Sequence, residues 1–370
     1  MKNTVVAIAI MGMGVSFAQA QEVVKIGGVA PLTGNISHLG KDLENGSRMA
    51  LEEANAQGIE IGGKKVKFEF IGEDDQADPR VGTTVAQRLV DQDVKGIVGH
   101  LNSGTSIPAS RIYDQAGIPM ISPASTNPTF TQQGFAGVFR TIANDIQQGT
   151  AIGQFSVEKL GAKKLAIIDD RTAYGQGLAD ETEKAAKAAG AEVVAREFTS
   201  NNATDFNAIL TKIRAANPDV IFFGGMDAQG GPMLRQLKQL GISAKFITGD
   251  GGCSPEMIRL AGDGINENVY CSMPGVPLAK MPGAAAFLER YKARFNADVQ
   301  VYSPYAYDAA NALVKAMQAA GSTDPAKYTP EIKKLNFPGV TGTVSFDDKG
   351  DIRGGAVTVY QFKGGDWSAM

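Results

Sequence analysis

The sequence contains few of the residues that carry most catalysis and metal binding. Its 370 residues include only 2 histidines, 2 cysteines and 1 tryptophan. It has no His-x-x-x-His metal pair, no Gly-x-Ser-x-Gly nucleophile turn and no phosphate-binding loop. A Ser-His hydrolase would have to use His38 or His100 and stays an alternative, but we expect no catalytic residue, no metal and no cofactor. Asp74, Asp75 and Asp78 lack the alternation and the glycine of a calcium loop.

A strong charge of one sign is also absent. The chain has 36 Lys and Arg against 39 Asp and Glu, a formal net charge of −3. Without a basic excess it has no large field to hold a phosphate backbone, so nucleic acid is not an expected partner. With 43% hydrophobic residues and 44 glycines, the composition fits a soluble α/β protein of about two domains.

Residues 1–20 have the pattern of a secretory signal peptide. Lys2 gives a positive start, an apolar run follows from Val5 to Phe17, and Ala18-Gln19-Ala20 is a small-x-small cleavage site. The run is too short for a comfortable membrane span, and no cysteine follows the cleavage site to accept lipid. A membrane anchor is the alternative, but we expect an exported, soluble mature chain that begins at Gln21.

Export to an oxidising compartment favours pairing of the two cysteines. Cys253 and Cys271 are therefore expected to form a disulfide. Closing a loop of this size would stabilise the fold by roughly 3 kcal/mol in the chain-entropy model. Two independent buried thiols remain the alternative.

Short β-branched runs and helical stretches alternate in two series, residues 23–98 and residues 164–248. This order is typical of βαβ units and a parallel sheet. Residues 94–126 and 218–253 also share one order of strand, polar loop, helix and strand, a weak internal repeat. The sequence therefore predicts two doubly wound α/β lobes with a cleft between them.

The last hundred residues are expected to complete both lobes, with a closing hairpin of residues 342–346 and 356–362. The chain would cross between the lobes near 140–144, 271–275 and 347–355, which makes a three-segment hinge. The expected division is residues 21–141 plus 274–348 for lobe 1, and residues 142–273 plus 349–370 for lobe 2.

Polar loops follow several of the expected strands, at the edge where open parallel sheets bind ligands. Ser103 opens a helix whose free N–H groups suit a ligand carboxylate. Asp250 could pair with an ammonium group that the ring of Tyr174 covers. Leu39 and Met226 offer apolar surface, so the cleft suits an α-amino acid with a hydrophobic side chain. Helix capping and turn formation are the alternatives for these polar residues.

The chain resembles the periplasmic leucine/isoleucine/valine-binding proteins, which have the type I solute-binding fold, over essentially the whole mature length. Any one of the shared motifs is weak, but their order and spacing together are specific. The motifs are Lys25 to Gly34, Asp74-Asp75 with Asp78-Pro79, Gly99 to Ser103, Ile121 to Thr126, Asp169 with Tyr174 to Gly177, Phe223 to Gly225, and Asp347 to Asp351.

The resemblance implies a site and a set of partners. Ser103 and neighbouring amides would bind the amino acid carboxylate, Ala124 and Thr126 would add backbone and hydroxyl bonds, Asp250 would hold the ammonium, and Tyr174 would close the site. The partners would be membrane permease subunits and ATPases of an ABC transporter, and a monomer suits such a carrier. The predicted ligand-binding residues are Leu39, Leu101, Asn102, Ser103, Ala124, Ser125, Thr126, Tyr174, Met226 and Asp250.

The sequence departs from the family pattern in the pocket walls. Well-known members carry aromatic residues where this chain has Met226 and often Leu39, a glutamate at Asp250, and a differently placed cysteine pair. Leucine, isoleucine and valine are the first expected ligands, and phenylalanine, alanine or a small amide are the alternatives. A ligand-sensing domain with the same fold is a further alternative, although it would need a separate signalling partner.

Overall fold

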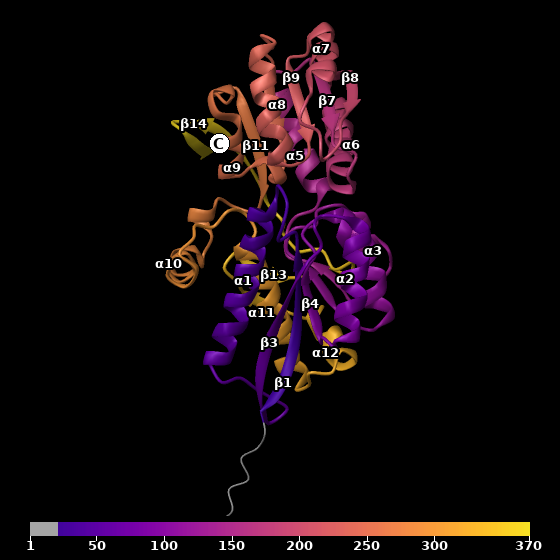
Figure 1. Ribbon diagram of the computed structural model, residues 1–370, viewed down its shortest axis with the longest axis vertical. Helices are drawn as coiled ribbons and strands as arrows, with labels where there is room; N and C mark the ends of the chain where they lie inside the picture. The colour runs from indigo at the N-terminus through magenta and orange to yellow at the C-terminus, as the bar shows by residue number, and fades with distance from the viewer. Residues whose placement is uncertain (1–20) are drawn as a thin grey trace, which may run out of the picture.

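The computed structural model describes residues 21–370, which form two lobes stacked along the long axis of the molecule (Figure 1). The predicted signal peptide, residues 1–20, lies outside the described residues. Within residues 21–370 no helix is both long and apolar enough to cross a membrane. The two-lobed α/β architecture that the sequence predicts is confirmed.

The first lobe is built on a six-stranded sheet with the order β2-β3-β1-β4-β5-β6. All neighbours are parallel except β2, which runs antiparallel to β3. The strands are β1 (Glu22–Ala30), β2 (Glu60–Ile61), β3 (Lys64–Asp74), β4 (Gly96–Gly99), β5 (Met120–Ser122) and β6 (Val138–Arg140). The helices that follow them are α1 (Ser37–Ala56), α2 (Pro79–Asp91), α3 (Ser103–Gln115) and α4 (Thr129–Gln132).

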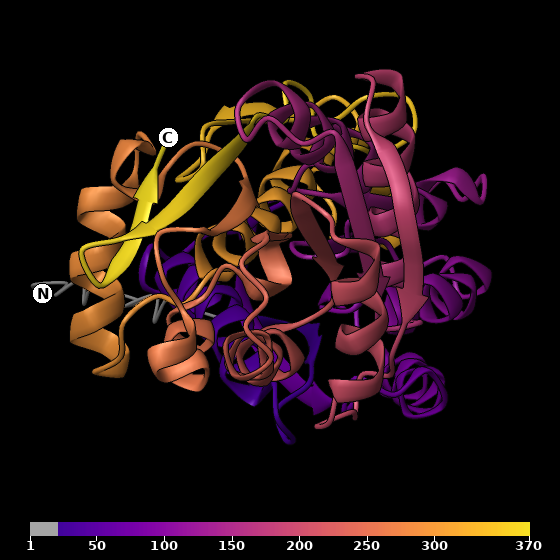
Figure 2. The ribbon, with the colours of Figure 1, turned by 90° about the horizontal axis from the view of Figure 1, so that it is seen from above.

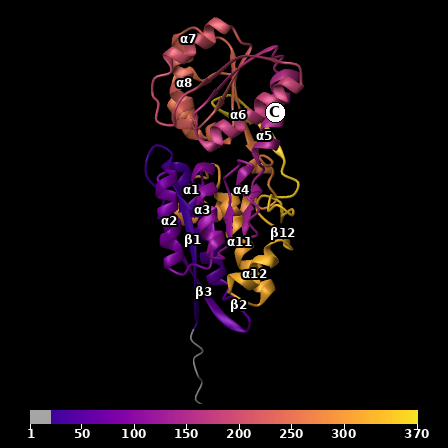
Figure 3. The same cartoon turned by 90° about the vertical axis from the view of Figure 1, so that its right-hand side faces the viewer.

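The second lobe is built on a seven-stranded sheet with the order β15-β14-β11-β10-β9-β7-β8. Its strands are β7 (Lys164–Asp169), β8 (Glu192–Phe198), β9 (Val220–Gly224), β10 (Lys245–Thr248), β11 (Val269–Pro274), β14 (Val357–Lys363) and β15 (Asp366–Ala369). Its helices are α5 (Asp145–Glu158), α6 (Ala173–Ala188), α7 (Asn207–Ala216), α8 (Asp227–Gln239), the 3-10 turn η1 (Asp250–Gly252), α9 (Pro255–Ala261) and the 3-10 turn η2 (Gly262–Gly264). Figure 3 shows α5 to α8 gathered on this lobe, above α1 to α3.

The C-terminal part of the chain contributes helices and strands to both lobes. It contains η3 (Leu278–Lys280), α10 (Ala284–Phe295), α11 (Ser303–Ala320), α12 (Pro325–Ile332), β12 (Asn336–Pro338) and β13 (Thr343–Ser345) before β14. Helix α11 packs along α1 and reaches β4 and β5. The chain thus passes between the two large sheets after β6, after β11 and before β14, while the exact division of residues between the lobes stays a prediction.

The predicted closing hairpin is wrong. Strand β13 pairs with β12, whereas β14 pairs with β11 on one side and with β15 on the other. Figure 2 shows β14 and the C-terminus at the edge of the second sheet. Two adjacent apolar runs suggested mutual pairing, but the unpaired edge of β11 offers β14 a longer partner, because five residue pairs match along it.

Local sequence explains where the site-forming helices begin. Asp78 caps α2 by accepting hydrogen bonds from the amides of Arg80 and Val81. Asn144 caps α5 in a capping box with Gln147. Gly99, before the loop that opens α3, has φ of 132° and lies against the Val29 carbonyl, where a Cβ atom would collide. These features fix the residues at which the loops end and the helices begin.

The sulfur atoms of Cys253 and Cys271 lie 1.95 Å apart, at bonding distance. Their Cα atoms are 5.3 Å apart, within the range that a disulfide spans. Cys253 directly follows η1, and Cys271 lies in the middle of β11. The pair therefore ties the loop that carries Asp250 to a central strand of the second lobe.

Candidate functional site

A cavity of about 480 Å³ opens between the lobes. Its walls come from loops and helix starts that follow the carboxyl ends of β1, β3, β4, β7, β8 and β9, the edge at which the sequence predicts a ligand. Among the predicted site residues, Asn102, Tyr174 and Met226 line the cavity. Asn35, Ile36, Gln76, Pro79, Asp170, Arg171, Thr172, Asn201 and Gln229 are among its other walls.

Asp250 lies behind Tyr174 and is held by two tyrosine hydroxyls. The Tyr174 hydroxyl donates to Oδ1 at 2.9 Å, and the Tyr302 hydroxyl donates to Oδ2 at 2.7 Å. Tyr174 Oη also accepts from the amide of Gly251, which fixes the direction of its own proton. Burial raises the pKa of Asp250, although the hydrogen bonds from both tyrosines oppose that rise. A carboxylate has about four acceptor positions, so Asp250 keeps capacity for a cationic donor.

A second buried carboxylate, Asp145, lies at the first residue of α5. Neither of its oxygens has a hydrogen-bond partner among residues 21–370. Burial raises its pKa to about 8, and the nearby charge of Asp250 adds to the rise. The Thr126 hydroxyl lies near enough to lower that pKa somewhat, but it has no partner of good hydrogen-bond geometry within the described chain.

The side-chain carbonyl of Gln148, one turn along α5, is likewise buried without a partner among the residues described. Buried acceptors are normally satisfied, and each one left unpaired costs roughly 1–3 kcal/mol. The carboxylates of Asp145 and Asp250 also influence each other's charge. Acceptors of this kind suit a ligand that brings several N–H donors and a positive charge.

The opposite side of the site is formed by the start of α3. The side chain of its N-cap residue, Asn102, does not cap the helix, and Asn102 Oδ1 is buried without a partner in the described part of the chain. Ser103 Oγ accepts from the amide of Asn127 at 3.2 Å, which ties α3 to the next loop. Because α3 has no side-chain cap, its first N–H groups can bind an anion.

Ser125 acts within the loop network instead of facing the cavity. Its hydroxyl contacts Ser106 Oγ and donates to the carbonyl of Leu101 at 3.0 Å. These contacts tie its loop to the loop after β4, so the Ser125 side chain serves neither as a helix cap nor in a local turn. Leu39, Leu101, Ser103, Ala124, Thr126 and Asp250 are buried but do not belong to the cavity wall.

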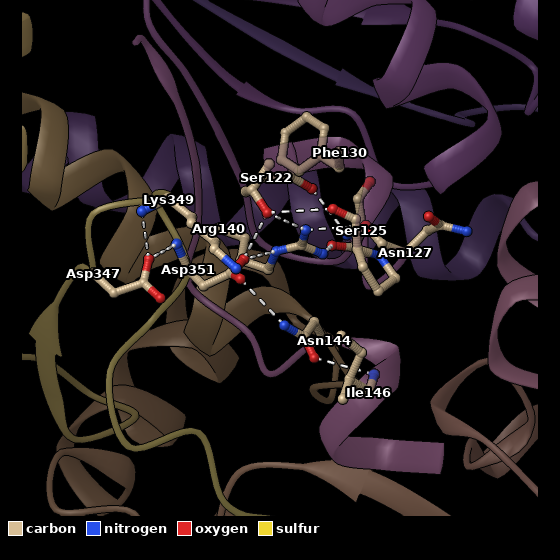
Figure 4. Close-up of polar contacts among 12 residues, drawn as sticks. Ser122, Ser125, Asn127, Phe130, Arg140, Asn144, Ile146, Asp347, Lys349 and Asp351 are labelled. Carbon is tan, nitrogen blue, oxygen red and sulfur yellow. Dashed lines mark hydrogen bonds and ion pairs between the residues drawn. The ribbon is translucent and has the colours of Figure 1, made fainter. Parts of the chain in front are cut away.

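A buried arginine holds the loop of Ala124 to Thr126 from behind (Figure 4). Arg140, at the end of β6, donates to the carbonyls of Ser125 at 2.6 Å and Asn127 at 3.0 Å. Its Nε donates to Asp351 Oδ1 at 2.6 Å. Burial lowers the pKa of Arg140, and the charge of Asp351 opposes that change.

Asp351 extends this network to α5. Its Oδ2 accepts from the side-chain amide of Asn144 at 3.2 Å, and Asn144 Oδ1 in turn accepts from the first amides of α5 (Figure 4). Arg140 and Asn144 lie on the first passage between the sheets, and Asp351 lies on the last. One buried cluster therefore connects the candidate carboxylate loop, two chain passages and the helix that carries Asp145.

Within residues 21–370, polar contacts link the lobes across the cleft. His38 Nε2, in α1, lies 2.7 Å from Asp227 Oδ2 at the start of α8. The Asn127 side chain donates to the Ala173 carbonyl at 2.7 Å. The third contact joins Tyr302 to Asp250. Burial opposes charge on His38, but the hydrogen bond and charge of Asp227 raise its pKa overall.

Tyr302, Asp145 and Gln148 were missed in the sequence. Asp145 follows an asparagine at a helix start, a position where an acidic residue needs no ligand to explain it. Tyr302 lies in the C-terminal part of the chain, far in sequence from the other residues of the site. It also lies far from the predicted crossings near 140–144, 271–275 and 347–355, so no local signal marked it.

Comparison with known proteins places these features in a family. A family described as periplasmic binding protein matches residues 23–366. An amino acid binding protein of Pseudomonas aeruginosa is 37% identical over 363 residues, 98% of this chain and 96% of the relative. Leu/Ile/Val-binding protein homolog 1 of Brucella abortus is 36% identical over 360 residues, with 96% and 94% covered.

Solved structures agree with the sequence relatives. The crystal structure of the leucine binding protein LivK from Thermotoga maritima superimposes with a TM-score of 0.87 at 30% identity, and the match covers 94% of this chain and 97% of that one. The resemblance and the fold class that the sequence predicts are therefore confirmed. The roles of the individual residues stay predictions.

Proposed function

The chain belongs to the periplasmic binding protein family, and we propose that it is the solute-binding component of an ABC importer, which binds a branched-chain or other aliphatic amino acid between its lobes. The observation that carries this proposal is the combination of two buried carboxylates near the cleft, Asp250 behind Tyr174 and Asp145 beside Thr126, with the uncapped start of α3 in the cavity wall. One side of the cleft suits an ammonium group and the other a carboxylate.

The roles of the residues follow from this polarity. The first amides of α3, Ser103 and Thr126 would hold the carboxylate, with the backbone of Ala124 beside them. Asp250 and Asp145 would hold the ammonium, and Tyr174 would cover it from the second lobe. Ile36 and Met226 in the cavity wall, with Leu39 and Leu101 behind it, supply apolar surface for an aliphatic side chain.

Delivery to a transporter completes the proposal. The family is one of solute-binding proteins, and its relatives here are named for the amino acids they bind. We infer that the mature chain works in the periplasm as a monomer, with the Cys253–Cys271 disulfide formed. It would dock on permease subunits, hydrolyse nothing and bind no nucleic acid. Closure about the three passages would rotate residues 21–141 with 274–348 against the rest of the chain.

A thermal-shift panel tests the proposed ligand class. Leucine, isoleucine and valine are expected to raise the melting temperature of the purified mature protein, because a ligand that binds only the folded state stabilises it by mass action, by roughly 2.7 kcal/mol at a hundred times its Kd. Phenylalanine, alanine and glutamine complete the panel as comparison solutes. No shift with any free amino acid, together with a shift for another small solute, would refute the ligand assignment.

Binding is also expected to release a proton from Asp145. Its pKa of about 8 in the closed structure without ligand means that the carboxyl group is mostly protonated at pH 7. An ammonium group beside it lowers that pKa, so binding expels the proton and affinity rises with pH up to about 8, by at most about tenfold per pH unit. Calorimetry in buffers of different ionisation enthalpy measures the release.

Two variants identify the source of that proton. Asp145→Asn carries no titrating group and is expected to remove the release, whereas His38→Gln is expected to keep it. Proton release that persists unchanged in Asp145→Asn would assign it to another group.

A further inference from the structure

The backbone that carries Tyr302 is fixed by a carboxylate from another helix. Asp42, a buried residue of α1, accepts hydrogen bonds from four consecutive amides at the start of α11. The distances are 3.1, 2.9, 2.7 and 2.9 Å for the amides of residues 300 to 303. The Tyr291 hydroxyl donates to the same carboxylate at 3.0 Å. Because one buried carboxylate accepts from five donors, the turn of residues 300 to 303 has little conformational freedom.

From this turn the Tyr302 side chain reaches the other lobe. Helix α11 packs on α1 of the first lobe, whereas Asp250 follows β10 of the second sheet. The Tyr302 hydroxyl nevertheless lies 2.7 Å from Asp250 Oδ2. Burial and the charge of Asp250 raise the pKa of Tyr302 well above its usual value, so the hydroxyl keeps its proton and acts as the donor.

The hydrogen bonds from the two tyrosines to Asp250 therefore differ in whether they need the lobes to be closed. Tyr174 follows β7 of the same sheet as Asp250, so its bond to Oδ1 does not require the lobes to meet. Tyr302 comes from the other side of the cleft, so its bond to Oδ2 exists only while the lobes are closed. Closure thus changes the environment of one carboxylate oxygen.

We propose that Tyr302 is a positioning residue that couples closure of the lobes to recognition of the ligand's ammonium group through Asp250. The inference rests on the proposed function of the cleft. In the closed form both oxygens of Asp250 are oriented by hydroxyl donors, and the remaining acceptor positions face a bound cation in a fixed direction. A carboxylate held in a fixed orientation binds an ammonium group better than one that rotates freely. Ligands with an amino group therefore favour the closed form.

Tyr302→Phe tests the proposal, since it removes one oxygen atom and keeps the ring. We expect the Kd for leucine to rise about tenfold or more, the loss typical of a hydrogen bond to a charged group. The increase should lie mainly in the dissociation rate, because the bond acts after closure. Tyr328→Phe is the matched control: Tyr328 is buried in α12 and its hydroxyl donates to the Lys95 carbonyl, away from the cleft.

A double-mutant cycle with Asp250→Asn separates positioning from a general structural effect. If Tyr302 acts through Asp250, then Tyr302→Phe costs much less affinity in the Asp250→Asn background than in the wild type. Equal losses in both backgrounds would overturn the proposal, as would unchanged leucine affinity in Tyr302→Phe. In either case wild-type leucine binding would still support the proposed function, whereas a wild type that binds no amino acid refutes both.

Discussion

Asp250→Ala is expected to weaken leucine binding by at least about 2 kcal/mol, a rise in Kd of about thirtyfold or more. The variant removes a fully buried carboxylate that accepts from Tyr174 and Tyr302, so the bound ammonium would lose its charged partner. Asp145 stays nearby and compensates in part, which is why the expected loss lies at the lower end of the range for buried charge pairs. Titration calorimetry measures the effect.

Asp308→Ala is a control for this variant. Asp308 is also a buried carboxylate that accepts hydrogen bonds, from the amides of Val340 and Thr341 and from the Thr341 hydroxyl, but it lies in α11 and does not line the cavity. Its loss should change leucine affinity far less than the loss of Asp250. Equal affinities for Asp250→Ala and the wild type would remove Asp250 from the site.

Asp351→Ala is expected to lower the free energy of unfolding by about 3 kcal/mol, because it leaves the guanidinium of Arg140 buried without its counter-ion. The side chain of Arg140 is 0% exposed and that of Asp351 is 13% exposed, so solvent screens the pair little. Asp351 also accepts from Thr131 and Asn144, which would lose a partner at the same time. Urea unfolding followed by circular dichroism gives the difference.

The solvent-accessible pair of Lys334 and Glu331 gives the comparison for Asp351→Ala. Glu331 lies in the last turn of α12 and Lys334 just after it, with 26% and 68% of their side chains exposed. Glu331→Ala is expected to change the unfolding free energy by no more than about 1 kcal/mol. Similar changes in the two variants would mean that the Arg140 cluster does not hold the passages between the lobes together.

The fold could be predicted because its signals are local. Alternating β-branched runs and helical stretches specify βαβ units, and the repeat of the series at residue 164 gives the second lobe. The prediction of a closing hairpin was wrong because β14 had two possible partners, β13 and the free edge of β11. The residues of β14 do not decide between them.

The edge of the cleft could be predicted because polar loops follow the strands, whereas the roles of single residues stay predictions. Ser103, Tyr174 and Asp250 lie in loops or helix starts after β4, β7 and β10, so the sheet edge places them near the cleft. Asp145 and Tyr302 lie near the cleft because of contacts between residues far apart in sequence. The amide of Asp145 donates to the Thr126 carbonyl, and the amide of Tyr302 donates to Asp42. Their residue types are ordinary in the sequence. Burial and unpaired oxygens distinguish Asp145, and the contact with Asp250 distinguishes Tyr302.

The most direct test of the account is a calorimetric comparison of leucine with two one-ended analogues, 4-methylpentanoate, which lacks the ammonium group, and 3-methylbutylamine, which lacks the carboxylate. If the start of α3 binds the carboxylate of leucine, and Asp250 and Asp145 bind its ammonium group, then each analogue binds at least about a hundredfold more weakly than leucine. An analogue that binds as tightly as leucine would show that the end it lacks is not recognised, and would contradict the two-ended site.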